Sequence, residues 1–187
     1  MLTEYVLADP LHGIAILAGL VLLDFGLAPL GRRILDRAVD ERARPEFLRM
    51  NPLYLERPRG LLGFAMTALG TAVVVFGSWW LSQETFLFLF GSLFFARLIS
   101  LVRHLRSFLA LVWLKLMPGA VEGGVRYSQA YVYRSSGTEL LLWAGLLGVA
   151  YAVVANPMFH GGAVTVGLIG LGHLFRSLRK RKSMLES

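Results

Sequence analysis

The 187-residue sequence contains no cysteine, and only 17% of its residues are charged. The absence of cysteine excludes disulfides, thiol catalysis and zinc sites built on cysteine. Soluble domains carry about 25% charged residues, so this chain falls well below them. Its hydrophobic share, 56%, is correspondingly high. These proportions predict an integral membrane protein with a single transmembrane domain that covers residues 1–187.

Common catalytic and nucleotide-binding motifs are also missing. The sequence has no HExxH, no phosphate-binding GxxxxGK, no GxSxG and no aspartate-rich lipid-transferase pattern. We therefore expect no catalytic residues, no cofactor and no resident metal. One alternative is a metal site formed by Asp9, His12 and His160, although nothing in the sequence fixes their spacing across helices.

Five apolar stretches predict an all-α bundle of five transmembrane helices. A stretch of about 20 residues crosses the roughly 30 Å hydrocarbon core of a bilayer. The predicted spans cover residues 11–30, 61–81, 85–105, 140–155 and 161–175, and the third continues as a cytoplasmic extension to residue 117. Ser136 and Glu139 fit a capping box that would open the fourth span.

An amphipathic cytoplasmic segment follows the first span. Ile34, Leu35 and Ala38 share one helical face, and the charged residues of this segment lie on the other. Two arrangements fit this pattern: a helix on the membrane surface, or a projecting extension of the first span. Pro29, which can kink or end a helix, stands close to the junction.

The positive charges indicate the orientation. If the N-terminus is outside, residues 1–10, 82–84 and 156–160 are extracytoplasmic, and they contain no lysine or arginine. Every lysine and arginine except Arg97 then lies in the regions 32–59, 103–134 and 176–182. Positive residues concentrate in cytoplasmic loops. The pattern predicts five spans in the plasma (inner) membrane, N-terminus out and C-terminus in, and it explains the net charge of +7 without nucleic acid.

Two charged residues interrupt the predicted spans. Asp24 lies thirteen positions after Leu11, and Arg97 lies twelve positions after Thr85. Because both helices run in the same direction, both charges lie roughly 18–20 Å below the outer surface, at about 1.5 Å per residue. We expect Asp24 and Arg97 to form an intramembrane ion pair, because an unpaired charge there costs about 3 kcal/mol or more. Such a pair either fixes the helix register or belongs to a solute pathway.

Arg97 also begins a polar face of the third span. Arg97, Ser100, His104 and Ser107 recur at intervals of three and four residues, which places them on one side of a helix. If this face turns inward, it lines a wet path for ions or small solutes. In such a path Arg97 favours anions and His104 titrates near neutral pH. Otherwise the lower half of the face lies near the lipid headgroups.

These features favour a small oligomeric channel or transporter-like protein that passes ions or small solutes. The alternative is a non-catalytic membrane scaffold or accessory subunit that binds partner proteins or anionic lipids. Stripes of glycine and other small residues favour a homo-oligomer in both cases. Four arginines on the predicted cytoplasmic side are expected to contact anionic lipid, namely Arg32, Arg33, Arg57 and Arg59.

Overall fold

The computed structural model describes residues 2–38, 61–116 and 128–185. Every regular element within these ranges is an α-helix, so the all-α prediction is confirmed. Short breaks at Asp9, around Ser82 and at Ala155 join successive helices. The helices are α1 (Leu2–Ala8), α2 (Pro10–Ala38), α4 (Leu61–Trp79), α5 (Gln83–Leu116), α6 (Gln129–Val154) and α7 (Pro157–Leu185).

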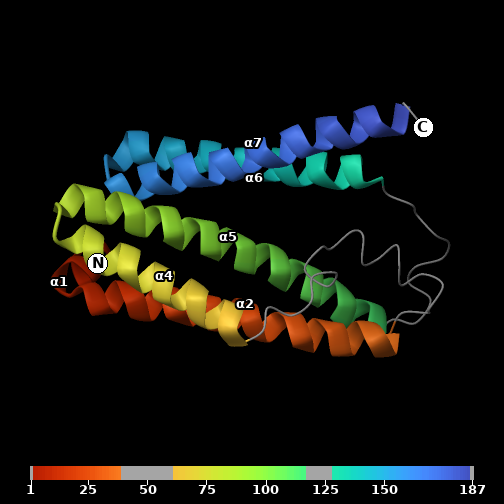
Figure 1. The fold of residues 1–187 in the computed structure, drawn as a ribbon, viewed down its shortest axis with the longest axis horizontal. Coiled ribbons are helices and arrows are strands. Elements are labelled where there is room, and N and C mark those ends of the chain that lie inside the picture. The colour runs from red at the N-terminus through yellow and green to blue at the C-terminus, as the bar shows by residue number, and fades with distance from the viewer. Residues whose placement is uncertain (1, 39–60, 117–127, 186–187) are drawn as a thin grey trace.

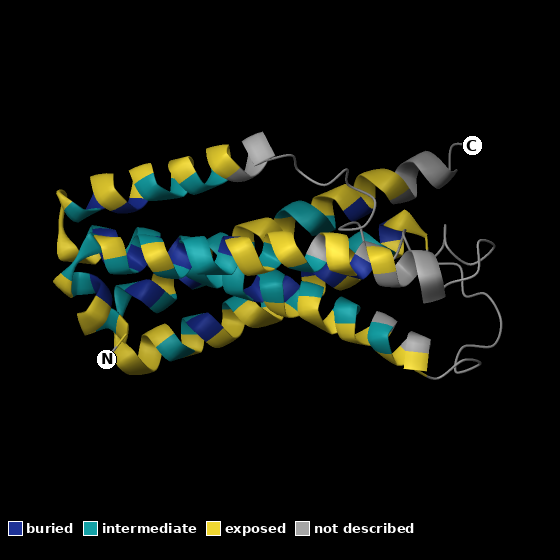
Figure 2. Cartoon of the chain, turned by 90° about the horizontal axis from the view of Figure 1, so that it is seen from below, coloured by how far each residue is buried: buried dark blue, intermediate teal, exposed yellow. Residues whose placement is uncertain are grey.

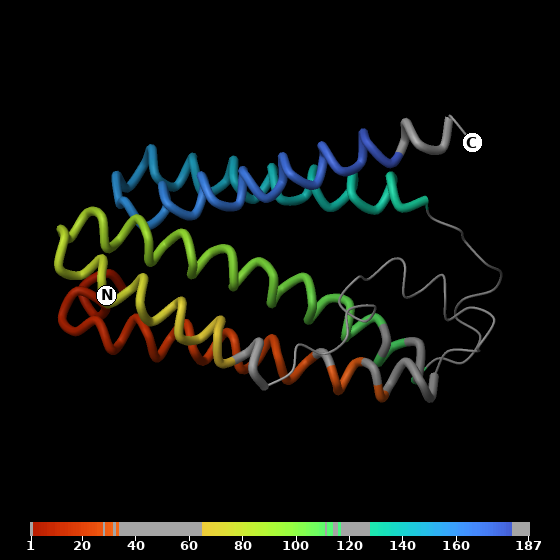
Figure 3. Tube along the Cα trace, viewed as in Figure 1, coloured from red at the N-terminus to blue at the C-terminus, as the bar shows by residue number. Residues whose placement is uncertain are grey.

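The five long helices alternate in direction along one bundle (Figure 1). Helices α2, α5 and α7 run away from the end that holds the N-terminus, and α4 and α6 run back toward it (Figure 3). We call these two ends the N-terminal end and the C-terminal end of the bundle. Helix α5 is central, because α7 packs on one of its sides and α2 and α4 pack on the other.

Four of the helices are long and apolar enough to cross a membrane. The qualifying stretches are Pro10–Gly31, Gln83–Ala110, Gln129–Val154 and Pro157–Lys180. Helix α4 has 19 residues, and its apolar stretch Ala65–Trp79 is shorter. The outward faces of the bundle are largely exposed (Figure 2). Many of the exposed residues are leucine, valine or aromatic. Such extensive exposed apolar surface is typical of contact with a membrane.

The core consists of two hydrophobic clusters that follow each other along α5. The first lies toward the N-terminal end, where Phe86 and Phe90 of α5 are fully buried with Val6, Leu17 and Val75. Phe86 and Phe90 stack with their ring centroids 6.0 Å apart. The second cluster lies between α5, α6 and α7 and consists of Ile99, Leu140, Leu147 and Val166.

Glycines allow the helix backbones to approach closely at two crossings. Helix α7 meets α5 at Gly91 and Gly161, and a Cβ atom on either residue would collide with the opposing backbone. Helix α6 meets α7 at Gly137, where a Cβ atom would lie 2.9 Å from the carbonyl oxygen of Gly170. In lipid the hydrophobic effect does not drive helices together, so close packing of this kind is a main source of their association.

Helix α2 does not end at Pro29. The proline lies inside the helix, which continues to Ala38. The start of the predicted amphipathic segment is therefore a direct extension of the first long helix. The remainder of that segment, from residue 39 onward, lies outside the described residues.

Helix α6 begins earlier than the predicted fourth span. Ser128 is its N-cap, and the Ser128 Oγ accepts a hydrogen bond from the backbone N–H of Tyr131 at 3.2 Å. Ser136 and Glu139 therefore lie inside α6, and the predicted capping box is wrong. The helix contains these polar residues because they face α5 and α7 and find partners there.

The glycine contact between α5 and α7 predicts a sharp difference between two alanine substitutions. Gly161→Ala should lower the melting temperature in detergent, because overpacking a tight contact costs about 1–3 kcal/mol. Gly148→Ala is the matched control, since no atom lies within 4 Å of a Cβ built there. The control should be neutral or slightly stabilising, because alanine is the better helix former. Equal melting temperatures for the two variants would contradict the α5–α7 contact.

Candidate functional site

The polar face of α5 turns toward the protein. Arg97, Ser100, His104 and Ser107 are each half-buried, whereas Leu105 on the neighbouring side of the helix is 43% exposed. The four residues that share a face in the sequence therefore share a half-buried face in the bundle. Their contacts differ from one another.

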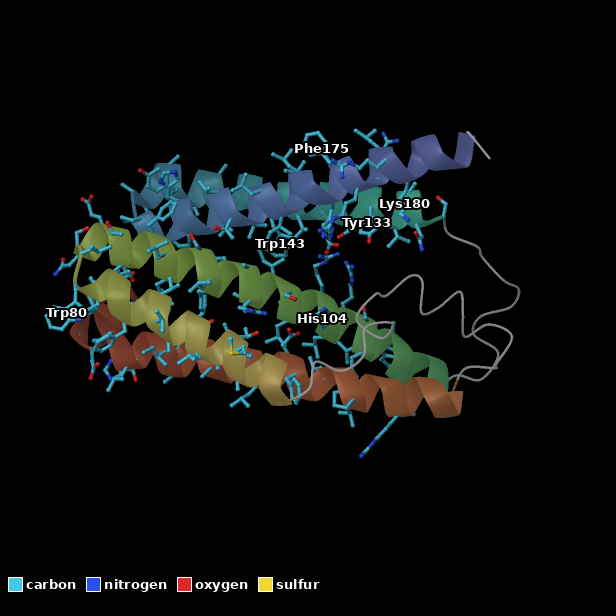
Figure 4. All side chains as sticks on the ribbon, viewed as in Figure 1. Trp80, His104, Tyr133, Trp143, Phe175 and Lys180 are labelled. Atoms are coloured by element: carbon cyan, nitrogen blue, oxygen red, sulfur yellow. The ribbon has the colours of Figure 1, made fainter. Side chains whose placement is uncertain are left out.

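Asp24 of α2 accepts a hydrogen bond from Nδ1 of His104 in α5. The two side chains are largely shielded, with 17% of Asp24 and 20% of His104 exposed. They meet where α2 and α5 lie side by side, and Figure 4 labels His104 at this position. Asp24 is thus paired with His104 instead of the Arg97 that the sequence analysis predicted.

The difference comes from the register of the two helices. The prediction assumed that the first and third spans begin at the same level. In the structure Gly13, near the start of α2, lies against Phe90 of α5, and a Cβ on Gly13 would be 3.3 Å from the ring. Gly13 is three residues into α2 and Phe90 is seven residues into α5. Helix α5 therefore begins about 6 Å further toward the N-terminal end, and Asp24 lies beyond Arg97.

Arg97 and Ser100 make no polar side-chain contact with the residues that the structure describes, so neither side chain has a hydrogen bond or an ion pair there. Ser107, at the lower end of the same face, donates to the backbone carbonyl of Arg103 at 3.1 Å. On the predicted pathway face, His104 is thus bonded to Asp24. Arg97 and Ser100, which lie nearer the N-terminal end of the bundle, have no polar partner among the described residues.

A second polar cluster lies on the opposite side of α5. The Nη2 atom of Arg103 donates to Oγ of Ser136 in α6 at 2.5 Å. The same Oγ shares a 2.7 Å hydrogen bond with Nδ1 of His173 in α7. The ring of Tyr133, labelled in Figure 4, packs edge-on against His173 with centroids 5.7 Å apart. One serine hydroxyl therefore connects three helices.

Glu139 of α6 completes this second cluster. Its carboxylate lies 3.4 Å from Nε of Arg103 and 3.1 Å from Nη1 of Arg106. The contact with Arg106 is weak, because that side chain is 68% exposed and water screens the pair. Nε of Arg103 is buried and has no hydrogen-bond partner in the described part of the chain, so Glu139 acts on it through charge alone.

Together the two clusters form what we call the ionisable layer. It lies at one level of the bundle, because Arg103 and His104 are successive residues of α5 that point to opposite neighbours. The two histidines of the layer, His104 and His173, thus lie on different sides of α5. The layer consists of Asp24, Arg103, His104, Arg106, Ser136, Glu139 and His173.

The alternative metal site is not assembled. The carboxylate of Asp9 accepts a hydrogen bond from the first turn of α2. The ring of His12 stacks on Tyr5 at 3.9 Å, and the ring of His160 stacks on Tyr151 at 4.7 Å. Within the described ranges, no three histidine, aspartate or glutamate side chains come together in an arrangement that could hold a metal.

The predicted lipid contacts can be placed only in part. Arg33 is exposed on the C-terminal part of α2, and Arg32 precedes it in the same helix. Arg57 and Arg59 lie outside the described residues.

A groove between α2 and α4, with a volume of about 320 Å³, is lined mostly by apolar residues such as Leu17 and Leu69.

The second cluster was not predicted from the sequence, although a signal was present. Arg103 and Arg106 are three residues apart, and so are Ser136 and Glu139. This spacing puts each pair on one helical face, so two complementary faces were available. The assignment of Ser136 and Glu139 to a helix N-terminus removed them from the bundle and concealed the match.

No protein-family model, curated protein or solved structure matches this chain. Its function is therefore inferred from the residues and the geometry of the ionisable layer and of the polar face of α5.

The contact between Asp24 and His104 predicts energetic coupling. Asp24→Asn and His104→Ala should each lower the stability in detergent by about 1–3 kcal/mol. The first replaces the charged acceptor by a weaker, neutral amide oxygen, and the second leaves Asp24 without its partner. A double-mutant cycle should give a coupling of about 0.5–3 kcal/mol for this pair. The comparison cycle combines Asp24→Asn with Arg97→Ala and should give a smaller coupling, because these two side chains make no direct contact. Coupling of Asp24 to Arg97 but not to His104 would show that the helix register differs from the one described.

Proposed function

We propose that the chain crosses the plasma (inner) membrane five times, with its N-terminus outside and its C-terminus in the cytoplasm. The alternating direction of the five long helices supports this topology. Helix α4, with 19 residues, is close to the length that a crossing needs. Lysine and arginine are absent from residues 2–9, 80–82 and 155–156 at the N-terminal end, and positive charge marks the cytoplasmic side.

Single cysteines test this topology, because the chain has none of its own. The exposed residues Leu2, Ser82 and Gln129 are suitable positions. In intact cells an impermeant maleimide should label Leu2→Cys and Ser82→Cys, and it should label Gln129→Cys only after permeabilisation. If α4 does not cross, Ser82 will be protected and Gln129 will be labelled from outside, which is the opposite pattern.

We further propose that the protein is a small channel or transporter-like protein whose path follows the polar face of α5. The observation that carries this proposal is the hydrogen bond between Asp24 and His104, within two stretches long enough to span a membrane. Ionisable side chains at such a depth are costly, and they typically mark ion pathways and proton relays. Because the groove between α2 and α4 is mostly apolar, we propose that a homo-oligomer completes the path.

Anionic lipids are the proposed partners at the C-terminal end. Arg33, Arg176 and Arg179 are exposed there, on α2 and α7. A lysine or arginine next to an anionic surface contributes about 1 kcal/mol of attraction. Arg32, Arg57 and Arg59 are proposed as further contacts on the basis of the sequence.

Reconstitution tests the transport proposal. Purified protein in liposomes should dissipate an imposed ion gradient faster than protein-free liposomes do. His104→Ala should change the pH dependence of the flux, because it removes the histidine ring from the proposed path. Asp24 of α2 is the charged group that faces His104, and α4 contains no ionisable residue. His12→Ala, on a histidine that stacks on Tyr5 at the N-terminal end, is the matched control and should leave the profile unchanged.

Liposomes that stay ion-tight at every pH would overturn the transport proposal. That outcome would favour the alternative of a non-catalytic scaffold, in which the contacts of Arg103, Ser136 and His173 serve only to hold α5, α6 and α7 together. A flux with an unaltered pH profile in His104→Ala would retain transport but remove the ionisable layer from the path.

A further inference from the structure

Arg97 lies in the middle of the contact between α2 and α5. Seven residues before it, Phe90 packs on Gly13, and seven residues after it, His104 binds Asp24. Seven residues are close to two helical turns, so these three residues of α5 share one face. Arg97 is also near the midpoint of the 28-residue apolar stretch of α5. Its position is therefore far from both ends of the span.

No opposite charge faces Arg97 from the neighbouring helices. The residues of α2 between Gly13 and Asp24 are all apolar, and α4 contains no ionisable residue. Asp24 itself is engaged by His104, roughly 10 Å further along α5. Arginine does not lose its proton in proteins, so the positive charge of Arg97 persists at mid-span.

Arg103 and Arg106, the next two arginines of α5, differ from Arg97 in this respect. Arg103 donates to Ser136 and lies beside Glu139, and Arg106 pairs with Glu139. These contacts hold α5 to α6. Arg97 makes no such contact with the described residues, so its guanidinium is available to a mobile ligand.

We propose that Arg97 and Ser100 bind a small monovalent inorganic anion of the chloride class, and that this anion is the ion that moves along the polar face of α5. The second part rests on the proposed transport function. The guanidinium offers five N–H donors, and the Ser100 hydroxyl adds one more from the next turn of the same face. One positive charge balances one negative charge, which favours a halide over sulfate or phosphate.

A binding measurement tests the site without any assumption about transport. The melting temperature of the purified protein is measured in detergent with sodium chloride and with sodium gluconate at equal ionic strength. Chloride should raise the melting temperature of the wild type, because a ligand that binds only the folded state stabilises it. Arg97→Gln should lose this shift, and Arg97→Lys should retain part of it. Arg134→Gln is the matched control, because it removes an exposed arginine near the start of α6.

A current measurement tests which ion moves. The zero-current potential of the wild type is measured across a planar bilayer with a potassium chloride gradient. It should have the same sign as the equilibrium potential of chloride. Arg97→Gln should lower the permeability ratio of chloride to potassium toward one, and Arg134→Gln should keep the ratio of the wild type. If Arg97→Gln does not fold, Arg97→Lys and the sign of the wild-type potential still decide the question.

The two measurements separate the possible failures. A chloride shift that persists in Arg97→Gln, or that is absent from the wild type, overturns the anion site. A zero-current potential with the same sign as the equilibrium potential of potassium overturns the assignment of chloride as the moving ion. The proposed transport function is retained in that case. The absence of any current overturns the transport function and the second part of this proposal, and the melting data then decide the binding site by themselves.

Discussion

The arrangement of the bundle depends on the need of a shielded polar side chain for a partner within the protein. Helix α5 carries ionisable groups on two opposite sides at one level, so no single neighbour can satisfy them all. On one side, His104 binds Asp24 of α2. On the other, Arg103 donates to Ser136 of α6, and Ser136 shares a hydrogen bond with His173 of α7. The central place of α5 follows from this need for partners on both sides.

Small residues make the second of these contacts possible. Ser136 and Gly137 are neighbours on α6, and Gly137 lies against Gly170 of α7 with almost no space between the backbones. His173 follows Gly170 by three residues, so it is on the same side of α7 and within hydrogen-bond distance of Ser136. The glycine contact and the polar contact thus form one unit, in which close packing brings the polar atoms together and the hydrogen bond fixes the register.

The helical architecture could be predicted from the sequence because apolar length and composition are properties of single segments. The partner of Asp24 could not, because it depends on an offset of about 6 Å between α2 and α5 that the packing of Phe90 on Gly13 produces. Ser136 and Glu139 were misplaced for a related reason. A polar stretch resembles a loop when it is considered alone, and only the arginines of α5 show that it belongs inside a helix.

The charges along the α2–α5 contact link the proposed anion to the protonation of His104. When Asp24 is ionised and His104 is neutral, the charges of Arg97 and Asp24 sum to zero. When His104 carries a proton, the net charge of the three side chains is +1. An anion at Arg97 and that proton would lie about 10 Å apart. At an effective dielectric constant of about 20, opposite unit charges at this separation attract by about 1.7 kcal/mol. Because such coupling is reciprocal, proton uptake at His104 raises the affinity for the anion as much as the anion favours the proton. Anion binding at Arg97 is therefore expected to be tighter when His104 carries a proton than when it is neutral.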